Sequence, residues 1–388
     1  MKDNIDKKSK KILNVVSVFF SLPFFLGDQL IYFTHKGYII HLVCSPSDKI
    51  EKFANDHLCQ YKEIDLLRKI SLFADIKATW QLYQYIKKEK FNIVCGHTPK
   101  GGLLSMIAAF IARIPQRVYF RHGLRYETCS GLKRTILIYC ERIASMLATK
   151  VVCVSNYLIE KSIDDHLSSQ KKMILLNYGS CNGVDALKQF NPNQINKQRK
   201  ELLRKELHLP QDAFIMGYAG RLVHDKGITQ LVQAFEKLSI VYPNIYLLLI
   251  GPYEDGDRLP SSTISTIKEN NKIIHTGLIE KEIEYYYSLM DIYILPSYRE
   301  GLPTCILEAS AMQIPVLTTS HSGSRDSMIN QETGIYVKID KDDIADKTEM
   351  LYNDATRRKQ LGINGRKFVL KYFNQQKIWE DIEHKLYL

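Results

Sequence analysis

Short apolar runs alternate with longer helix-like stretches along the whole chain, and this alternation restricts the fold more than any other feature. Most runs, such as KVVCVS and IYLLLIG, are continuously apolar instead of alternating between apolar and polar residues. Continuous runs are typical of strands buried on both faces of a parallel sheet. Helical sequence between such strands is what right-handed β-α-β crossovers require. We therefore predict an α/β protein with doubly wound parallel sheets.

The runs fall into two sets of about six strands, which indicates two domains. A polar, Asn/Gln-rich segment at residues 186–200 separates the sets and is typical of a linker. We predict Rossmann-like domains at 1–195 and 196–371, followed by a helix at 372–388 that returns to the first domain. Ligands of such sheets bind beyond the carboxyl ends of the strands. We therefore expect the chemistry in loops that face a cleft between the domains.

Composition excludes several classes of protein. With 45% hydrophobic and 24% charged residues, the chain is neither collagen-like nor a coiled coil, and it lacks long disordered tracts. The eight cysteines are scattered without a C-x-x-C pair. This pattern argues against a zinc site or a disulfide framework and favours a reducing cytoplasm.

The net charge suggests an anionic partner. Fifty-three Lys and Arg against 42 Asp and Glu leave a formal charge of +11. Nucleic acid, a membrane surface and a phosphorylated small molecule are all compatible with this surplus. Residues 91–150 concentrate it and form either a solvated basic face or an anion-binding surface. Their cations are Lys100, Arg113, Arg117, Arg121, Arg125, Lys133, Arg134, Arg142 and Lys150.

The first residues combine a basic and an apolar stretch, KKSKK followed by ILNVVSVFFSLPFFLG, as a signal peptide does. At about 16 residues the apolar run is shorter than the ~20 needed to span a bilayer. It contains Pro23 and no cleavage site follows it. We predict a buried strand at residues 12–20, with no signal peptide or transmembrane helix. The run GGLLSMIAAFIA is expected to be a core helix, with an interfacial helix as the alternative.

Two strand-to-helix loops in the second set carry chemistry. In GYAGRLVHDKG, glycines allow a ligand to approach the backbone, and Arg221 and Lys226 are spaced to converge on a pyrophosphate; the alternative is two exposed cations. In SYREGLPTCILEAS, a helix is expected to begin near Pro303, so its free N–H groups can bind an anion. Glu300 and Glu308 flank this start, and a carboxylate can accept hydrogen bonds from both hydroxyls of a ribose.

The two loops, in this order and spacing, resemble the donor-site motifs of the retaining glycosyltransferases of family 4, which have the GT-B fold. The resemblance covers nearly the whole chain. GHTPKGGLLSMIAA, HGLRYE and GSCNGVD are similar to bacterial enzymes of capsule, O-antigen or glycan-precursor assembly. The resemblance implies a hexosyl- or N-acetylhexosaminyltransferase that uses a nucleotide-sugar, with UDP favoured, and a polyprenyl-diphosphate-linked acceptor.

The resemblance also implies roles for individual residues. Arg221 and Lys226 would neutralise the donor diphosphate, Glu308 would bind the ribose, and Glu300 and His122 would contact the donor sugar. The residues assigned to catalysis are His122, Glu300, Arg221 and Lys226. Those assigned to donor binding are Gly220, Arg221, Lys226, His275, Thr276, Gly277, Glu300, Gly301, Leu302, Pro303, Thr304 and Glu308. Those assigned to the acceptor side are Gly27, His97, Lys100 and Arg125. A hydrogen-bonded core role is the alternative for either histidine.

The implied reaction transfers the sugar with retention, and the leaving phosphate takes the acceptor proton. We expect no cofactor and no obligatory metal. Asp255-Gly256-Asp257 matches the D-x-D metal clamp of the other large glycosyltransferase fold, but we interpret it as a solvated turn because cations and a helix N-terminus already serve the diphosphate. The segment SLPFFLGDQ departs from the family, since it carries only Gly27 where paired glycines are usual.

Two other functions stay open. One is a nucleotide-sugar epimerase of GT-B fold, which would need no acceptor. The other is a basic nucleic-acid-binding protein, although no zinc-finger spacing, RNP-type strand or basic helix supports it. The cations of residues 91–150 beside apolar sequence also suggest peripheral contact with anionic lipid at the inner face of the cytoplasmic membrane.

Overall fold

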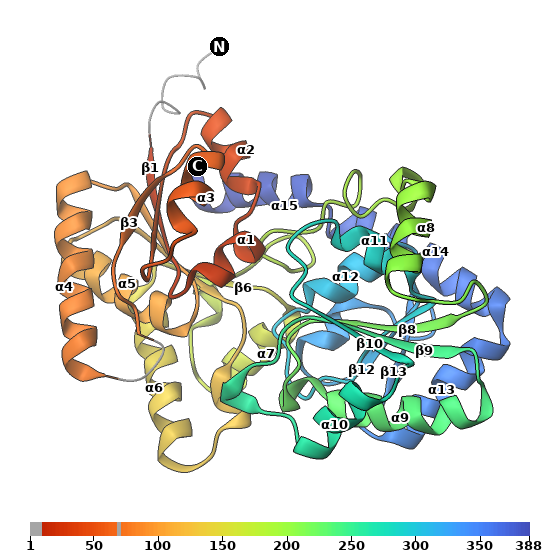
Figure 1. The fold of residues 1–388 in the computed structure, drawn as a ribbon. Helices are drawn as coiled ribbons and strands as arrows, with labels where there is room; N and C mark the ends of the chain where they lie inside the picture. The colour runs from red at the N-terminus through yellow and green to blue at the C-terminus, as the bar shows by residue number, and fades with distance from the viewer. Residues whose placement is uncertain (1–9, 68–70) are drawn as a thin grey trace. The chain divides into compact units, whose positions relative to one another are not determined.

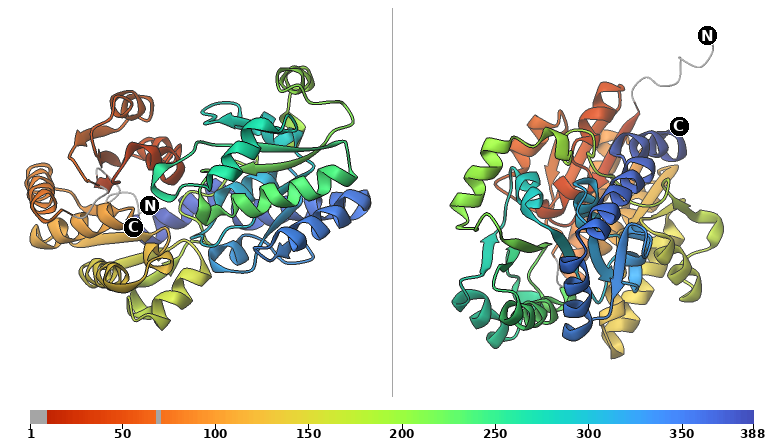
Figure 2. Two further views of the ribbon diagram at one scale, coloured as in Figure 1. Left: turned by 60° about the horizontal axis from the view of Figure 1, so that its bottom comes forward. Right: turned by 90° about the vertical axis from the view of Figure 1, so that its right-hand side faces the viewer.

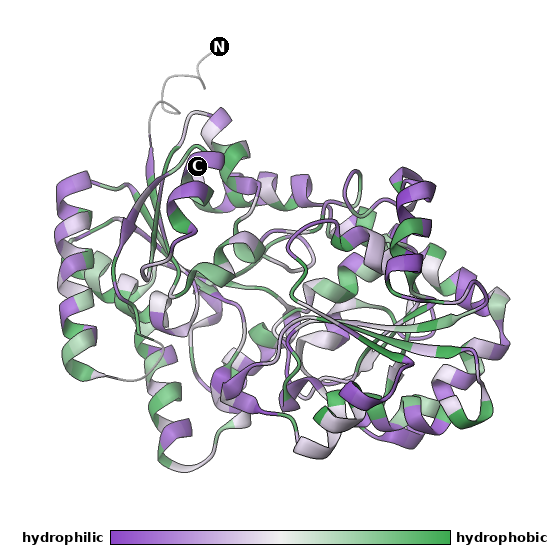
Figure 3. Cartoon of the chain, in the orientation of Figure 1, coloured by the Kyte–Doolittle hydropathy of each residue, from purple (hydrophilic) through white to green (hydrophobic). Residues whose placement is uncertain are grey.

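The computed structural model describes residues 10–67 and 71–388 (Figure 1). The chain forms two compact units. Unit 1 holds the described residues up to Gly183 together with Gln375–Leu388, and unit 2 is Val184–Asn374. Each contains one parallel sheet covered by helices, as expected from the continuous apolar runs, and Figure 3 shows apolar residues concentrated along the strands.

The sheet of unit 1 has seven parallel strands in the order β3-β2-β1-β4-β5-β6-β7. The chain winds to one side from β1 to β3 and to the other side from β4 onward, so the sheet is doubly wound. The strands are β1 (Lys11–Val15), β2 (Ile39–Cys44), β3 (Gln60–Glu63), β4 (Ile93–Gly96), β5 (Gln116–Arg121), β6 (Lys150–Cys153) and β7 (Met173–Leu175).

The prediction of a strand at residues 12–20 is wrong at its second half. β1 ends at Val15, and the apolar sequence continues into a 3-10 turn and the short helix α1 (Leu22–Phe25), which has Pro23 in its first turn. One apolar run therefore contains two elements. The edge strand β3 escaped prediction because its sequence, QYKE, is polar and all four of its residues are exposed.

The remaining helices of unit 1 cover both faces of its sheet. They are α2 (Gln29–His35), α3 (Ile50–Asp56), α4 (Leu72–Glu89), α5 (Pro99–Ile111), α6 (Gly131–Leu147), α7 (Asn156–Asp164) and α15 (Gln375–Ile382). α5 is the expected core helix. It packs between α4 and α6, and a Cβ on Gly102 would lie 2.2 Å from the ring of Tyr119. No helix of residues 10–67 and 71–388 is both long enough and apolar enough to cross a bilayer.

The C-terminal segment belongs to unit 1. α15 packs on α2, and the indole nitrogen of Trp379 donates a hydrogen bond to Asn182 Oδ1 at 2.9 Å. A π-helical turn, Glu383–Tyr387, follows, and Tyr38 donates to Glu383 at 3.3 Å. These contacts hold residues from the two ends of the chain together.

One buried ion pair connects β5 to two helices. Arg121 is fully buried at the end of β5, and its guanidinium donates to Glu141 at 3.0 Å, to Ser162 at 2.7 Å and to Ser145 at 2.5 Å. Tyr119 donates to the same Glu141 carboxylate at 2.9 Å. Each of the three guanidinium nitrogens of Arg121 thus donates a hydrogen bond inside the protein. This corrects its assignment to a basic surface, because a buried and paired cation cannot face a lipid or a nucleic acid.

We predict that Arg121→Met destabilises unit 1 by about 3–5 kcal/mol, because it leaves the carboxylate of Glu141 buried without its charge partner. Urea denaturation, monitored by near-UV circular dichroism, measures this loss in the free energy of unfolding. The double variant Arg121→Met/Glu141→Leu should recover most of the stability, since it removes both charges. A loss below about 1 kcal/mol in the single variant would contradict the prediction.

The sheet of unit 2 has six parallel strands in the order β10-β9-β8-β11-β12-β13. They are β8 (Phe214–Ala219), β9 (Ile245–Ile250), β10 (Ile273–Gly277), β11 (Ile292–Leu295), β12 (Val316–Thr319) and β13 (Gly334–Val337). Figure 2 shows helices on both faces of this sheet. The helices are α8 (Lys197–Glu206), α9 (Ile228–Val241), α10 (Ser261–Glu269), α11 (Ile283–Leu289), α12 (Thr304–Ala311), α13 (Lys341–Asn353) and α14 (Ala355–Tyr372).

The chain divides between Gly183 and Val184, earlier than the boundary at 195 that the polar segment suggests. Arg366 on α14 explains the difference. Its guanidinium donates to the carbonyls of Ala186 at 2.9 Å and Phe190 at 3.0 Å. The start of the polar segment is therefore bound to unit 2 through its backbone, which its side-chain composition does not reveal.

Candidate functional site

The two donor loops predicted from sequence lie side by side in unit 2. They follow β8 and β11, which are paired neighbours, and parallel strands present their carboxyl ends at the same edge of a sheet. Lys226 from the first loop forms an ion pair of 2.5 Å with Glu300 from the second. The hydroxyl of Tyr293 on β11 also donates to the carbonyl of Ala219, the last residue of β8, at 3.0 Å. The predicted convergence of the motifs is thus present in the fold.

The first loop begins with a close approach of two backbones. Gly220 has φ +150°, and a Cβ on Gly251, which follows β9, would lie 1.9 Å from the carbonyl oxygen of Gly220. Tyr218 supports the turn by donating to the carbonyl of Arg221 at 2.7 Å. The side chain of Arg221 is 43% exposed and pairs with Glu254. Its guanidinium is therefore held at the rim of the sheet and remains accessible to a ligand.

The second loop is held by the segment after β12. The N–H of Glu300 donates to Ser322 Oγ at 2.8 Å, and Gly323 donates to the carbonyl of Glu300 at 3.0 Å. A Cβ on Gly323 would lie 1.7 Å from the carbonyl oxygen of Gly301, so the packing needs glycine there. These contacts place the backbone of Gly301, Leu302 and Pro303 beside a nearly buried Glu300 (9% exposed). α12 begins at Thr304 with Pro303 as its N-cap, close to the predicted position.

Glu308 lies on α12 and is half-buried. Its carboxylate accepts a hydrogen bond from Tyr287 at 2.8 Å. Burial raises the pKa of Glu308 to about 7, and the hydrogen bond from Tyr287 only partly opposes this shift. The group changes charge near neutral pH, so its capacity to accept hydrogen bonds from hydroxyl groups is pH-dependent.

His275, Thr276 and Gly277 form the end of β10, next to the residue that follows β9. His275 Nε2 lies 2.8 Å from the carbonyl oxygen of Gly251, which requires the Nε2-protonated tautomer, and its ring packs on Tyr253 at 4.8 Å. Gly251 donates to the carbonyl of Gly277 at 2.8 Å. These residues share the carboxyl edge of the sheet with the two donor loops, and their assignment to donor binding stays a prediction.

Carboxylates near the first loop already have protein partners. Asp255 and Asp257 form a 3-10 turn, in which Asp255 pairs with Arg258 at 2.7 Å. Asp257 accepts the N–H of Asp225 at 2.7 Å. His224, Asp225 and Asp257 bring one ligand atom each within 4.8 Å of one another. Their spacing could admit a cation, yet their hydrogen bonds explain the cluster as a support of the loop. The expected independence from metal stays a prediction.

In unit 1 the structure brings together His97 and His122, which follow β4 and β5. His97 Nδ1 lies 3.1 Å from His122 Nε2, and the ring of Phe25 stacks on His122 with a centroid distance of 3.7 Å. Sequence analysis missed Phe25. The only signal for it was the departure of SLPFFLGDQ from the paired-glycine pattern.

The other residues assigned to the acceptor side have clear structural surroundings. Lys100, in the first turn of α5, pairs with Asp75 on α4 at 2.7 Å. Arg125 is exposed in the 3-10 turn after β5. Gly27, with φ +43°, lies between α1 and α2, and a Cβ there would lie 2.8 Å from the carbonyl oxygen of Pro23. The catalytic and binding roles of all these residues stay predictions.

Comparison with known proteins agrees with this arrangement. Residues 199–368 match the family described as Glycosyl transferases group 1, and residues 14–155 match Glycosyl transferase 4-like. The capsular polysaccharide biosynthesis glycosyltransferase CapM of Staphylococcus aureus is 36% identical over 379 residues, which are 97% of this chain and 96% of CapM. The UDP-Gal:alpha-D-GlcNAc-diphosphoundecaprenol alpha-1,3-galactosyltransferase of Escherichia coli is 28% identical over 304 residues, 77% of this chain and 76% of that enzyme.

Solved structures show the same fold. Anabaena Alr3699/HepE in complex with UDP and glucose superposes with a TM-score of 0.81 at 17% identity and covers 97% of this chain and 99% of its own. WaaG, a glycosyltransferase involved in lipopolysaccharide biosynthesis, gives a TM-score of 0.72 at 12% identity, with 96% and 99% coverage. Together with the relation to CapM along nearly the whole chain, the two parallel sheets and the converging donor loops establish that this chain belongs to the family-4-like, group 1 glycosyltransferases and has the GT-B fold.

Proposed function

We propose that this protein is a retaining glycosyltransferase that moves a hexose or N-acetylhexosamine from a UDP-sugar to a polyprenyl-diphosphate-linked glycan during the assembly of a surface polysaccharide. The observation that carries the proposal is the convergence of Lys226 and Glu300 from two separate loops. The names of the relatives support its finer parts. CapM is named for capsular polysaccharide, and the Escherichia coli enzyme for UDP-galactose and a diphosphoundecaprenol-linked acceptor.

The chemistry follows from the charges of the donor loops. The bond between the anomeric carbon and the phosphate oxygen breaks, a bond to the acceptor oxygen forms on the same face, and the departing phosphate takes the acceptor proton. Arg221 and Lys226 stabilise the negative charge that grows on the diphosphate. Both cations form ion pairs with carboxylates, Arg221 with Glu254 and Lys226 with Glu300. Donor binding therefore exchanges partners, and Glu300 becomes free to accept hydrogen bonds from sugar hydroxyls.

Nucleotide release, screened over UDP-, GDP- and ADP-sugars, tests the proposal when each donor is offered with and without polyprenyl-diphosphate-linked sugars. UDP release that depends on the acceptor supports it. Conversion of the donor without any acceptor would identify an epimerase instead. Release that a chelator abolishes and Mg²⁺ or Mn²⁺ restores would contradict the metal-independent mechanism. Retention on a nucleic-acid column at moderate salt, without release from any donor, would favour a nucleic-acid-binding protein.

We predict that Arg221→Ala and Lys226→Ala each lower kcat/KM at least ~10-fold, because a hydrogen bond to a charged group is worth about 1.5–3 kcal/mol. Steady-state release of the nucleotide measures the effect. Lys237→Ala is the matched control, since Lys237 is an exposed lysine of α9 that pairs with Asp342 away from both donor loops. Turnover close to wild type in both loop variants would contradict the assignment.

We predict opposite effects of Glu308→Gln on stability and on donor binding. The folded-state pKa of about 7 lies above the ordinary 4.5, so the wild type loses stability as pH rises from about 4.5 to 7. The variant lacks this loss. Its Tm should exceed that of the wild type at pH 8, and the difference should vanish near pH 5.

Donor binding should respond in the other direction. The charged carboxylate is the stronger hydrogen-bond acceptor, so wild-type affinity for UDP should fall as pH drops below 7. Affinity of Glu308→Gln should be about 10-fold weaker at pH 8, and it should change less between pH 5 and 8 than the wild-type affinity, because only the titration of the UDP phosphate remains. Scanning fluorimetry and calorimetric titration with UDP at pH 5 and 8 measure both effects. A variant less stable than wild type at pH 8, or equal to it in UDP affinity there, would contradict the assignment.

We also propose peripheral contact with anionic lipid, through the exposed face of α6. Its exposed apolar side chains recur every three or four residues, which places them along one side of the helix. They are Leu132, Ile136, Tyr139, Ile143 and Met146. Lys133 and Arg134 are exposed beside them, and the only acid in the sequence of α6, Glu141, is buried against Arg121. An apolar face bordered by cations suits the interface of an anionic membrane.

The N-terminal half of α4 extends this surface. It exposes Leu72, Phe73, Ile76 and Trp80, and Figure 3 shows apolar residues at this end of α4 and along α6. The two helices flank α5, where Lys100 pairs with Asp75 of α4.

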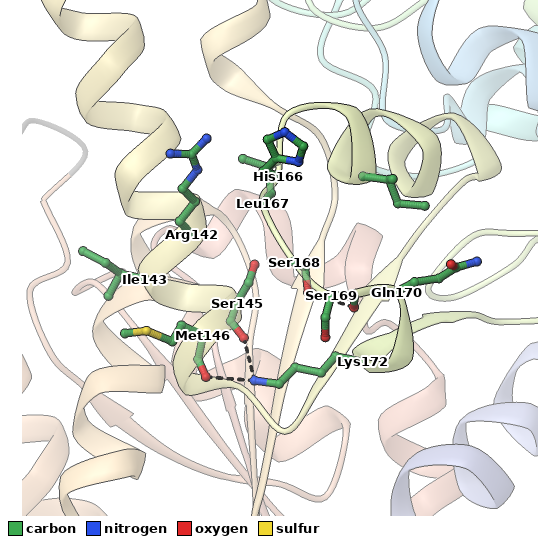
Figure 4. Close-up of a pocket in the computed structure, with 11 residues that line it drawn as sticks. Arg142, Ile143, Ser145, Met146, His166, Leu167, Ser168, Ser169, Gln170 and Lys172 are labelled. Carbon is green, nitrogen blue, oxygen red and sulfur yellow. Dashed lines mark hydrogen bonds between the residues drawn. The ribbon is translucent and has the colours of Figure 1, made fainter.

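A hollow of about 610 Å³ lies at the C-terminal end of α6, and Figure 4 shows the residues that line it. Its apolar lining residues are Ile143 and Met146 of α6, Ile163 of α7, and Leu167, which follows α7. The ammonium group of Lys172 donates hydrogen bonds to carbonyls at the end of α6, including that of Met146 at 2.9 Å. This cation therefore already has partners within the protein. Exposed apolar side chains on α4 and α6 and the apolar walls of this hollow thus all belong to unit 1.

We predict that the protein sediments with vesicles containing anionic phosphatidylglycerol and that salt weakens this binding. Lys133→Glu/Arg134→Glu should lower the bound fraction at least ~10-fold, because each cation near the surface is worth about 1 kcal/mol and reversal makes it repulsive. Lys205→Glu/Lys268→Glu is the matched control, since it reverses two exposed lysines of unit 2. Binding indifferent to the first double variant would contradict the proposed surface.

A further inference from the structure

Three side chains at the carboxyl ends of neighbouring strands in unit 1 form a hydrogen-bonded chain. Asn14 lies in β1, His97 follows β4 and His122 follows β5, and β1, β4 and β5 are adjacent in the sheet. His97 Nε2 lies 3.2 Å from Asn14 Oδ1, and His97 Nδ1 lies 3.1 Å from His122 Nε2. Asn14 is 2% exposed and His97 is 1% exposed, while His122 is half-buried. The chain therefore runs from the interior of the sheet to an accessible imidazole.

The hydrogen bonds that join Asn14, His97 and His122 all run in one direction, with His122 donating to His97 and His97 donating to Asn14. The amide oxygen of Asn14 can only accept, so His97 Nε2 carries a proton. A neutral His97 then has a lone pair on Nδ1, which accepts a hydrogen bond from His122 Nε2–H. A neutral His122 is left with an unprotonated Nδ1. Burial lowers the pKa of His97 well below its usual value, and the neighbouring His122 adds to this shift; burial lowers the pKa of His122 to about 3. Both rings therefore stay neutral at physiological pH, as this direction requires.

Phe25 restrains the plane of the same imidazole. Its ring lies nearly parallel to that of His122, at 7°. Phe25 ends α1, and its carbonyl accepts a hydrogen bond of 3.0 Å from Gln29, whose amide also donates to the carbonyl of Cys181 at 3.3 Å. The segment with the unusual sequence SLPFFLGDQ thus supplies an aromatic face for His122.

We propose that Asn14 and His97 are positioning residues that hold His122 in the Nε2-protonated tautomer, with Phe25 fixing its ring, so that Nδ1 is presented as a hydrogen-bond acceptor for a hydroxyl group of the sugar substrate. The proposal rests on the proposed function of His122 at the reacting sugar. It assigns a role to Asn14 and Phe25, and it explains the departure of the segment around Gly27 from the paired-glycine pattern.

The tautomer can be measured without any activity. Protein labelled with ¹⁵N-histidine gives two-bond correlation patterns that distinguish Nε2–H from Nδ1–H, and His122→Gln assigns the signals. We expect the Nε2–H pattern for both His97 and His122 between pH 6 and 9. An Nδ1–H pattern for His122, which results if the amide group of Asn14 donates instead, or a charged His122 in this range would overturn the proposal. This result does not depend on whether the protein transfers a sugar.

Kinetics of two Asn14 variants test the positioning role. Asn14→Leu removes the acceptor, and kcat should fall about 10-fold at all pH values with little change in the KM of the donor. Asn14→Asp keeps an acceptor but favours protonation of His97, which would then donate to His122 Nε2 and reverse its tautomer. Its kcat should approach the wild-type value at pH 9 and decrease as the pH is lowered. The wild-type kcat should show no such decrease.

Asn92→Asp is the matched control, because Asn92 is exposed and its side-chain oxygen accepts the N–H of Lys11 at the start of β1. It should keep the wild-type pH profile. Equal, pH-independent losses in Asn14→Leu and Asn14→Asp would show a merely structural role and overturn the proposal. Absence of transfer by the wild type with every donor and acceptor would count against the proposed function, and the tautomer measurement would still decide the hydrogen-bonded chain.

Discussion

The reversal of winding at the middle of each sheet is the constraint on which the rest of the structure depends. In unit 2 it makes β8 and β11 neighbours, so loops that are far apart in the chain leave the same edge. Lys226 and Glu300 are 74 residues apart and still form an ion pair. In unit 1 the same reversal places β1 beside β4, which brings Asn14 within hydrogen-bonding distance of His97. Both arrangements follow from parallel pairing and not from local sequence.

Some of the Lys and Arg residues of the chain have partners inside the protein, and others are exposed on its surface. Arg121 and Arg366 act inside the protein, where they bind a buried carboxylate and backbone carbonyls. Arg221 and Lys226 form ion pairs with Glu254 and Glu300 at the carboxyl edge of the unit 2 sheet. Lys133 and Arg134 remain exposed beside apolar side chains. The count of 53 Lys and Arg therefore overstates the number of exposed cations, because some are buried or paired with acids; the pairs leave the net charge of +11 unchanged.

The two candidate sites differ in character. The donor loops of unit 2 carry charged, partly exposed side chains, and their glycines allow backbones to approach within distances that a Cβ would forbid. The corresponding loops of unit 1 carry neutral rings that stack on one another, with Phe25 against His122 and His97 against Phe120 at 4.4 Å. Charge suits a diphosphate, whereas neutral rings with a defined tautomer suit a hydroxyl group.

The sequence by itself determined the fold class, the two sets of strands and the pair of donor loops, because continuous apolar runs and glycine-rich strand ends depend on local composition. It did not reveal β3, whose exposed residues leave no apolar pattern, or the end of β1, which lies inside one apolar run. Only the tertiary structure decided that Arg121 is buried, that Arg366 holds the start of unit 2, and that Asn14 and Phe25 meet the two histidines. These roles come from contacts between residues distant in the chain, whose geometry is set when the sheet aligns its strands.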